Sequence, residues 1–147
     1  METETNALQE SDLHQIGEVA ERTGLSLRTI RYYEEMGLVV PSGRTPGGFR
    51  LYTEEDIDRL ELVKRLKVLD LSLESTSDML AARDLLAAGA ARAESEDAIE
   101  ILASYADAAE ERLQKLAGRL EGARSAVKDL RSEVRRRRRA AGAASPK

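Results

Sequence analysis

Residues 16–34 decide the fold, and they read IGEVAERTGLSLRTIRYYE. Apolar residues recur at helical spacing from Ile16 onwards, and Gly24 is a residue type that commonly ends a helix. Ser26 is a good N-cap for a second helix whose apolar residues continue to Met36. Two short helices joined by a short turn that contains glycine are typical of a helix-turn-helix motif, although a plain helical hairpin has the same pattern.

The next residues predict a small β-hairpin. Leu38–Val40 are strand formers, residues 41–48 (PSGRTPGG) are turn formers, and Phe49–Tyr52 alternate again as a strand would. A hairpin that directly follows a helix-turn-helix predicts a winged helix, with Arg44 at the tip of the wing and Arg50 on the returning strand.

Two further helices are expected before the last long segment. Thr53 is predicted to cap a third helix, with Asp56 three positions later completing the cap. A fourth helix is expected from Ser72 or Ser75 to about Gly89. The sequence therefore predicts a mostly α-helical chain with five parts: an acidic flexible N-terminus (1–13), a winged helix-turn-helix domain (14–71), a linker helix (72–92), a dimerising coiled-coil helix (93–137) and a flexible tail (138–147).

The coiled coil is predicted from an apolar stripe whose members are spaced alternately three and four residues apart. Its members are Ile99, Leu102, Ala106, Ala109, Leu113, Leu116, Leu120, Ala123, Val127, Leu130 and Val134. This stripe spans five heptads, and at 1.5 Å per residue the helix would be roughly 50 Å long. One chain offers no other element of that length, so a second copy is expected to cover the stripe in a two-fold dimer. Parallel and antiparallel pairing are both open.

The composition argues against an enzyme. Only 41% of the 147 residues are hydrophobic and 3% aromatic, which is little material for a large domain around a deep pocket. The chain has no cysteine, which excludes disulfides and thiolate metal sites, and His14 alone cannot build a histidine cluster within one chain. We expect His14 to be an ordinary polar residue, and we expect neither a metal nor a cofactor.

The net charge of −4 conceals an uneven distribution. Residues 22–52 hold five arginines and only two acids, and a local basic surface is sufficient for phosphate binding. The five consecutive arginines Arg135–Arg139 have two interpretations: favourable charge at a helix C-terminus, or a flexible basic arm for DNA or another acidic partner. The polar, acidic N-terminus does not resemble a secretory signal and no apolar run approaches membrane-spanning length, so we expect a soluble cytoplasmic protein.

Residues 16–34, together with Gly37-Leu38, Pro41 and residues 48–52 (GFRLY), closely resemble the mercury-resistance-regulator (MerR) family of bacterial transcription regulators. The resemblance covers about residues 14–75. It implies a homodimer whose two winged helices bind a pseudo-palindromic promoter site, with the second helix in the major groove and the wing along the backbone.

The resemblance also assigns DNA-binding residues by position. They are Ser26, Arg28, Thr29, Arg31 and Tyr32 on the second helix, Arg44, Arg50 and Tyr52 on the wing, and Lys67 at the end of the third helix. Arginine suits phosphates and guanine edges, and hydroxyl groups bond phosphate oxygens. We expect Tyr33 and Phe49 to be packing residues instead of contacts.

Family members typically distort an overlong promoter spacer so that RNA polymerase, a partner implied here too, can engage both promoter elements. The alternative is an architectural or partner-recruiting DNA-binding protein without a small-molecule effector. The absence of cysteine excludes the soft-metal and thiol-redox sensing branches.

The chain departs from the family in two further respects. With about 13 residues after Val134, we expect no large appended ligand domain. Asp70 and Leu71 stand where the family commonly has a glycine and an aromatic residue, so the hinge that transmits an effector signal is expected to differ. Any ligand is expected between the fourth helix and the coil, near Arg83, Arg92 or Tyr105.

Overall fold

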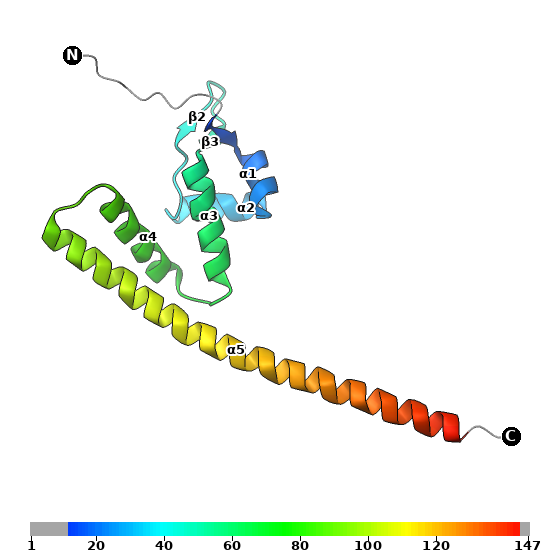
Figure 1. Ribbon diagram of the computed structural model, residues 1–147. Helices are drawn as coiled ribbons and strands as arrows, with labels where there is room; N and C mark the ends of the chain where they lie inside the picture. Colours follow the sequence, from blue (N-terminus) through cyan, green and yellow to red (C-terminus); the bar gives the residue numbers. More distant parts are fainter. Residues whose placement is uncertain (1–11, 145–147) are drawn as a thin grey trace, which may run out of the picture.

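The computed structural model describes residues 12–144. Its elements, in chain order, are β1 (His14–Gln15), α1 (Ile16–Thr23), α2 (Leu27–Glu35), β2 (Gly43–Arg44), β3 (Arg50–Tyr52), α3 (Glu54–Lys67), α4 (Leu73–Ala87) and α5 (Arg92–Ala143). Figure 1 shows α1–α3 and the small sheet as one head, α4 packed along the first part of α5, and the rest of α5 projecting alone. The predicted mostly helical fold, a winged helix-turn-helix followed by a long helix, is confirmed. Residues 1–11 and 145–147 of the expected flexible ends lie outside the described residues.

The helix boundaries follow local chemistry. Gly24 adopts φ 71° and its N–H donates to the Ala20 carbonyl, which ends α1 in the left-handed conformation that glycine adopts easily. Ser26 accepts a hydrogen bond from the Thr29 N–H and so caps α2. Thr53 and Asp56 form the predicted capping box at the start of α3. These three predictions are confirmed.

The sheet corrects the predicted hairpin. It is antiparallel with strand order β1-β3-β2, and its outer wing strand is only Gly43–Arg44. The predicted strand at Leu38–Val40 is wrong, because Leu38 and Val39 are buried in the core without belonging to any strand. A short apolar run is compatible with either outcome, and here packing against the helices decided it.

One hydrophobic core joins the winged helix to α4 and to the start of α5. Its buried members are Val19, Ile30, Tyr33, Leu38, Val39, Tyr52, Ile57, Leu60, Val63, Met79, Leu80 and Tyr105. Where α4 meets α5, the hydroxyls of Thr76 and Tyr105 are hydrogen-bonded at 2.9 Å in the buried interior. The head and the first part of the long helix therefore pack as one unit.

The turn between α3 and α4 contains Asp70 with φ 54°, the one non-glycine residue of positive φ within the described part of the chain. Glycine tolerates this left-handed region without strain, and Asp is one of the few other residues found there. The structure thus places Asp70 in a backbone conformation that suits glycine.

The long helix differs from its prediction in two respects. First, α5 continues through the arginine run to Ala143, so residues 138–143 of the expected flexible tail are helical. Alanine and arginine are both strong helix formers, which accounts for the extension. Second, α4 packs beside the N-terminal end of the stripe and covers only part of it. Leu102 of the stripe packs against the core, and its off-stripe neighbours Ala98 and Tyr105 are buried, whereas Ile99 is 54% exposed.

The C-terminal part of the stripe has no cover within residues 12–144. Leu113, Leu120, Val127, Leu130 and Val134 are 47–62% exposed, and they lie on the projecting part of α5. None of the helices in this described range is long and apolar enough to cross a membrane.

Candidate nucleic-acid interface

Helix α2 presents a basic face to solvent. Ile30 and Tyr33 are buried in the core, whereas Arg28, Arg31 and Tyr32 are exposed. Residues three and four positions apart share one face of a helix, so these exposed side chains lie together. Within residues 12–144 neither Arg28 nor Arg31 forms an ion pair. Their guanidinium groups are therefore available for phosphates and base edges.

The first turn of α2 supplies two hydroxyl groups beside this face. The Ser26 hydroxyl accepts from the Thr29 N–H at 3.0 Å, and the two hydroxyl oxygens are hydrogen-bonded to each other at 2.8 Å. One of the two hydroxyls donates in that bond, so the other keeps its proton for an outside acceptor such as a phosphate oxygen.

A groove brings Lys67 to the same surface. Arg28, Thr29, Tyr32 and Lys67 line a groove of about 380 Å³, together with apolar side chains of α3 and α4. Lys67 is exposed at the end of α3, and like Arg28 it forms no ion pair within the described residues. The structure therefore groups four of the nine predicted DNA-binding residues around one groove, which Asp70 also lines.

A carboxylate of α2 holds the wing. Glu34, whose side chain is 16% exposed, lies 2.6 Å from Arg50 Nε and 3.8 Å from Arg44 Nη2. The Tyr52 hydroxyl donates to the same carboxylate at 3.1 Å. Glu34 raises the pKa of Arg50, which keeps the wing cation charged. One side chain of α2 therefore contacts both strands of the wing, the central strand β3 through Arg50 and the outer strand β2 through Arg44.

Tyr52 does not reach the surface, which corrects its prediction as a direct DNA contact. Its side chain is wholly buried. Burial first, and the nearby Glu34 carboxylate second, raise the pKa of its hydroxyl to about 12, so the hydroxyl stays protonated and can donate. Tyr52 thus positions Glu34 and, through it, the wing arginines.

The wing tip exposes an aromatic ring that the sequence interpretation assigned to packing. Phe49 is 67% exposed, so its prediction as a packing residue is wrong. The same prediction is confirmed for Tyr33, which is buried. Arg44 Nη1 donates to the Gly48 carbonyl at 3.1 Å, which braces the turn. A side chain at Gly47 would meet the Phe49 ring at 3.4 Å, so the ring lies over that glycine. The position of Phe49 next to a run of turn-forming residues was the sequence signal that could have indicated this exposure.

A charged cluster connects the start of the domain to α3. The His14 ring lies 2.9 Å from Glu18 and 2.8 Å from Glu54, and Arg22 makes two hydrogen bonds to Glu54 at 2.6 and 2.8 Å. The hydrogen bond from Arg22 holds the pKa of Glu54 at about 2. His14 is also paired with Tyr52 in the sheet, so this polar residue has a structural place in the domain.

The predicted ligand residues do not converge. Arg83 and Arg92 are exposed, Arg92 pairs with Glu96 at 3.2 Å, and Tyr105 is buried against Thr76. A pocket of about 330 Å³ between α4 and α5 includes Tyr105 but neither arginine. In the part of the chain that the structure describes, no group of three or more His, Asp or Glu residues is placed to hold a metal ion.

Comparison with known proteins identifies this arrangement. Residues 15–83 match the family described as MerR HTH family regulatory protein. The HTH-type transcriptional regulator ZntR of Escherichia coli (strain K12) is 42% identical over 71 residues, covering 48% of this chain and 50% of that relative. YfmP of Bacillus subtilis (strain 168), another HTH-type transcriptional regulator, is 53% identical over 60 residues, covering 40% of this chain and 43% of the relative.

A solved structure matches beyond the winged helix. HiNmlR, a MerR family regulator lacking the sensor domain and bound to promoter DNA, is 25% identical with a TM-score of 0.60, covering 74% of this chain and 76% of its own. The chain spans about half the length of the curated relatives it matches. Residues 15–83 of this chain therefore form a MerR-type HTH domain.

Proposed function

We propose that the protein is a sequence-specific DNA-binding transcription regulator that binds a pseudo-palindromic promoter site as a homodimer in the cytoplasm. The observation that carries this proposal is the basic face of α2, held at a fixed position relative to the wing by Glu34. HiNmlR, which shares this fold, is bound to promoter DNA, and this supports the same partner here.

The exposed residues suggest a division of roles. Arg28, Arg31 and Tyr32 enter the major groove with α2, where arginine can bind guanine edges or phosphates. Lys67, Arg44 and Arg50, with the hydroxyls of Ser26 and Thr29, bind phosphates on either side. Phe49 at the wing tip packs against a sugar or a base step in the adjacent minor groove, as apolar side chains of other groove binders do.

Dimerisation is proposed through the exposed C-terminal part of the stripe on α5. The charges of α5 favour an antiparallel pair. Residues 92–111 carry seven acids and one base, a formal charge of −6, while residues 112–139 carry eleven bases and three acids, a charge of +8. A parallel pair would place like halves side by side, whereas an antiparallel pair places acid beside base. The two heads then stand at opposite ends of the coil.

Such a dimer is suited to deforming its site. Two heads fixed at opposite ends of one coil impose their own spacing on the DNA, and a spacer of different natural length must bend or untwist to fit. We propose that this distortion sets how RNA polymerase engages the promoter.

Footprinting of the purified protein on the DNA upstream of its own gene tests the proposal. We expect a symmetric protected site with hypersensitive bases at its centre. Diffuse protection with a steep salt dependence, similar on all sequences, would instead support an architectural or partner-recruiting protein.

Arg31→Ala is the matching variant for base recognition. If Arg31 reads a base, the variant should weaken binding by about 1–3 kcal/mol and relax the preference at one position of each half-site. Arg83→Ala, on the exposed face of α4, serves as the control. Equal weakening of Arg31→Ala on all sequences would place Arg31 on a phosphate instead.

A further inference from the structure

The arginine run Arg135–Arg139 fits neither interpretation that its sequence suggested. The run is helical, so it is not a flexible arm. It also ends four residues before the last helical residue, Ala143, and the final turn contains no basic residue. Stabilisation by the helix dipole is confined to the last turn, so the run lies too far from the helix end to benefit fully from it.

The run is also short of partners in its own chain. Among the described residues, Arg137 is the one member with an ion pair, to Glu133 at 3.3 Å. All five side chains are exposed. Arginines three and four positions apart on a helix repel one another, so this concentration of charge destabilises the isolated helix. An acidic surface from outside the chain would remove that cost.

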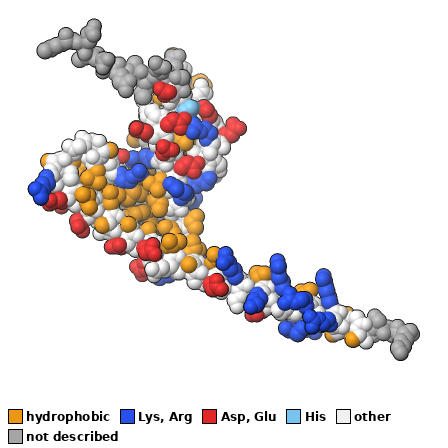
Figure 2. Space-filling model, viewed as in Figure 1, with side chains coloured by type: hydrophobic (Ala, Val, Ile, Leu, Met, Phe, Trp, Pro, Cys, Tyr) orange, Lys and Arg blue, Asp and Glu red, His pale blue; other side chains and the backbone are white. Residues whose placement is uncertain are grey.

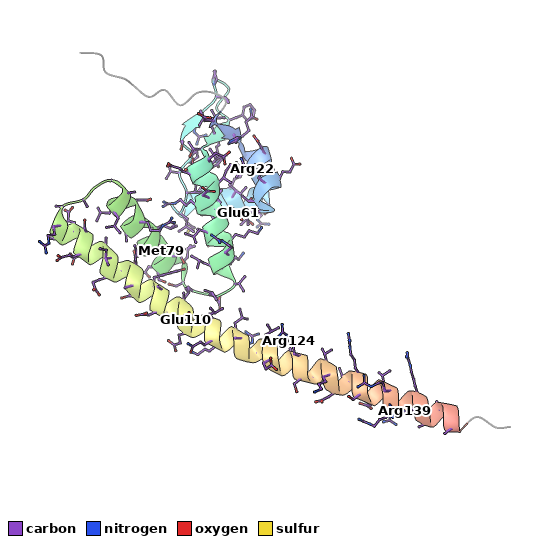
Figure 3. All side chains as sticks on the ribbon, in the orientation of Figure 1. Arg22, Glu61, Met79, Glu110, Arg124 and Arg139 are labelled. Atoms are coloured by element: carbon purple, nitrogen blue, oxygen red, sulfur yellow. The ribbon has the colours of Figure 1, made fainter. Side chains whose placement is uncertain are left out.

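A second copy offers such a surface on the first part of α5. Its acids are Glu94, Glu96, Asp97, Glu100, Asp107, Glu110 and Glu111, all of them exposed. Figure 3 shows Glu110 near the point where α5 leaves α4 and Arg139 near the far end of the same helix. Figure 2 shows Lys and Arg side chains gathered on that projecting end.

A row of every seventh residue beside the apolar stripe shows the match most clearly. The row reads Glu96, Ala103, Glu110, Ala117, Arg124, Arg131 and Arg138. Positions that flank a coiled-coil seam face the partner helix and form interhelical ion pairs. Two acids, Glu96 and Glu110, alternate with alanines in the first part of this row, and three arginines follow in the second part. Two such rows are complementary when the helices run in opposite directions.

We propose that the arginine run of each copy docks on the acidic segment 94–111 of a second copy, which closes the two ends of the coil with identical ion-pair clusters. This inference rests on the proposed dimer. It does not need one particular register, because the acids extend over eighteen residue positions, from Glu94 to Glu111, about 26 Å of helix. The run therefore specifies the direction of pairing and the identity of the partner.

Two charge-reversed forms of the full chain test the docking. The first form carries Arg135→Glu, Arg136→Glu, Arg138→Glu and Arg139→Glu. The second form carries Glu96→Lys, Asp107→Lys, Glu110→Lys and Glu111→Lys. In a mixture, both ion-pair clusters of the heterodimer are favourable, whereas each homodimer places like charges together. We expect each homodimer to dissociate at least about tenfold more readily than the wild type, and the mixture to form heterodimers.

Analytical ultracentrifugation of the wild type, the two forms and their mixture separates the possible failures. A monomeric wild type would contradict the proposed dimer itself. A wild-type dimer with equally tight homodimers of both forms and random mixing would overturn the docking alone. A further variant replaces all five arginines of the run with glutamine. If this variant dimerises like the wild type and its operator binding depends less on salt, the run contacts DNA and the docking is overturned.

Discussion

At the scale of single residues, the interface depends on a carboxylate that contacts no DNA in our proposal. Glu34 pairs with Arg50 at 2.6 Å and accepts the Tyr52 hydroxyl, so it joins the recognition helix to the wing. The sequence indicated the arginines by their type and place. It could not indicate that Tyr52 lies beneath them, because an aromatic residue on a strand of three residues can face either side.

Tyr52→Phe tests this arrangement. The change removes only the hydroxyl, so the free energy of unfolding should fall by about 1 kcal/mol, the usual contribution of such a bond. Urea denaturation measures it. The dependence of operator affinity on salt should stay at the wild-type slope, because no phosphate contact is lost. Arg44→Ala, by contrast, should reduce that slope by about 1. A reduced slope in Tyr52→Phe would return Tyr52 to the DNA contacts.

The pairing of Glu54 makes stability depend on pH in acid. The Arg22 hydrogen bond lowers the pKa of Glu54 from an ordinary value of 4.5 to about 2. A lowered pKa contributes stability that is present above the ordinary value and is lost as the pH falls towards 2. The free energy of unfolding of Glu54→Gln should therefore fall less than that of the wild type between pH 4.5 and pH 2. Urea denaturation at a series of pH values measures this difference. Glu55→Gln, at the exposed neighbour, should follow the wild type.

At the scale of elements, helix ends were predictable and strands were not. Ser26, Thr53 and Ser72 each cap a helix as their side-chain chemistry requires, and these signals are local. The strand β1 consists of two residues that pair with β3 across more than thirty positions of sequence, and no local pattern indicates it. Leu38–Val40 had strand-forming side chains, but Leu38 and Val39 pack in the core without forming a strand, and Val40 is exposed.

The α3–α4 turn gives a prediction at this scale. Asp70 holds φ 54°, which costs a side chain with a Cβ more than it costs glycine. Asp70→Ala should lower the free energy of unfolding by about 1 kcal/mol, and Asp70→Gly should leave it unchanged or raise it by up to about 0.5 kcal/mol. Thermal and urea denaturation of both variants measure the difference. Equal stability of the two variants would contradict a left-handed residue at this turn.

At the scale of the whole molecule, the charge pattern and the stripe predicted a long helix that pairs with a second copy. They could not show which residues of the helix pack against α4 in the same chain. Of these residues, Leu102 lies on the predicted stripe, whereas Ala98 and Tyr105 each lie one residue before a stripe position. Apolar residues three or four positions apart form one face of a helix, and this face can be covered by a helix of the same chain or by a second copy. The sequence pattern is the same in both cases.

Leu120→Ala tests the remaining stripe. Leu120 is 52% exposed on the projecting part of α5, and two copies of it would be buried in the proposed dimer. Losing about 1.5 kcal/mol from each copy should raise the dimer dissociation constant by roughly a hundredfold. Sedimentation equilibrium measures this constant. Ile101→Ala, exposed but off the stripe, is the control and should leave the dimer unchanged.

The buried Thr76–Tyr105 contact has a mechanical consequence. From this point α5 continues for about 50 Å to the arginine run, at 1.5 Å per residue. A rigid rod of that length converts each degree of tilt at its base into nearly 1 Å of travel at its tip. Small changes in the packing of α4 against α5 would therefore produce large changes in the distance between the two α2 helices of the dimer. Substitutions at Thr76 or Tyr105 should change the bend angle of the bound DNA more than the affinity for it.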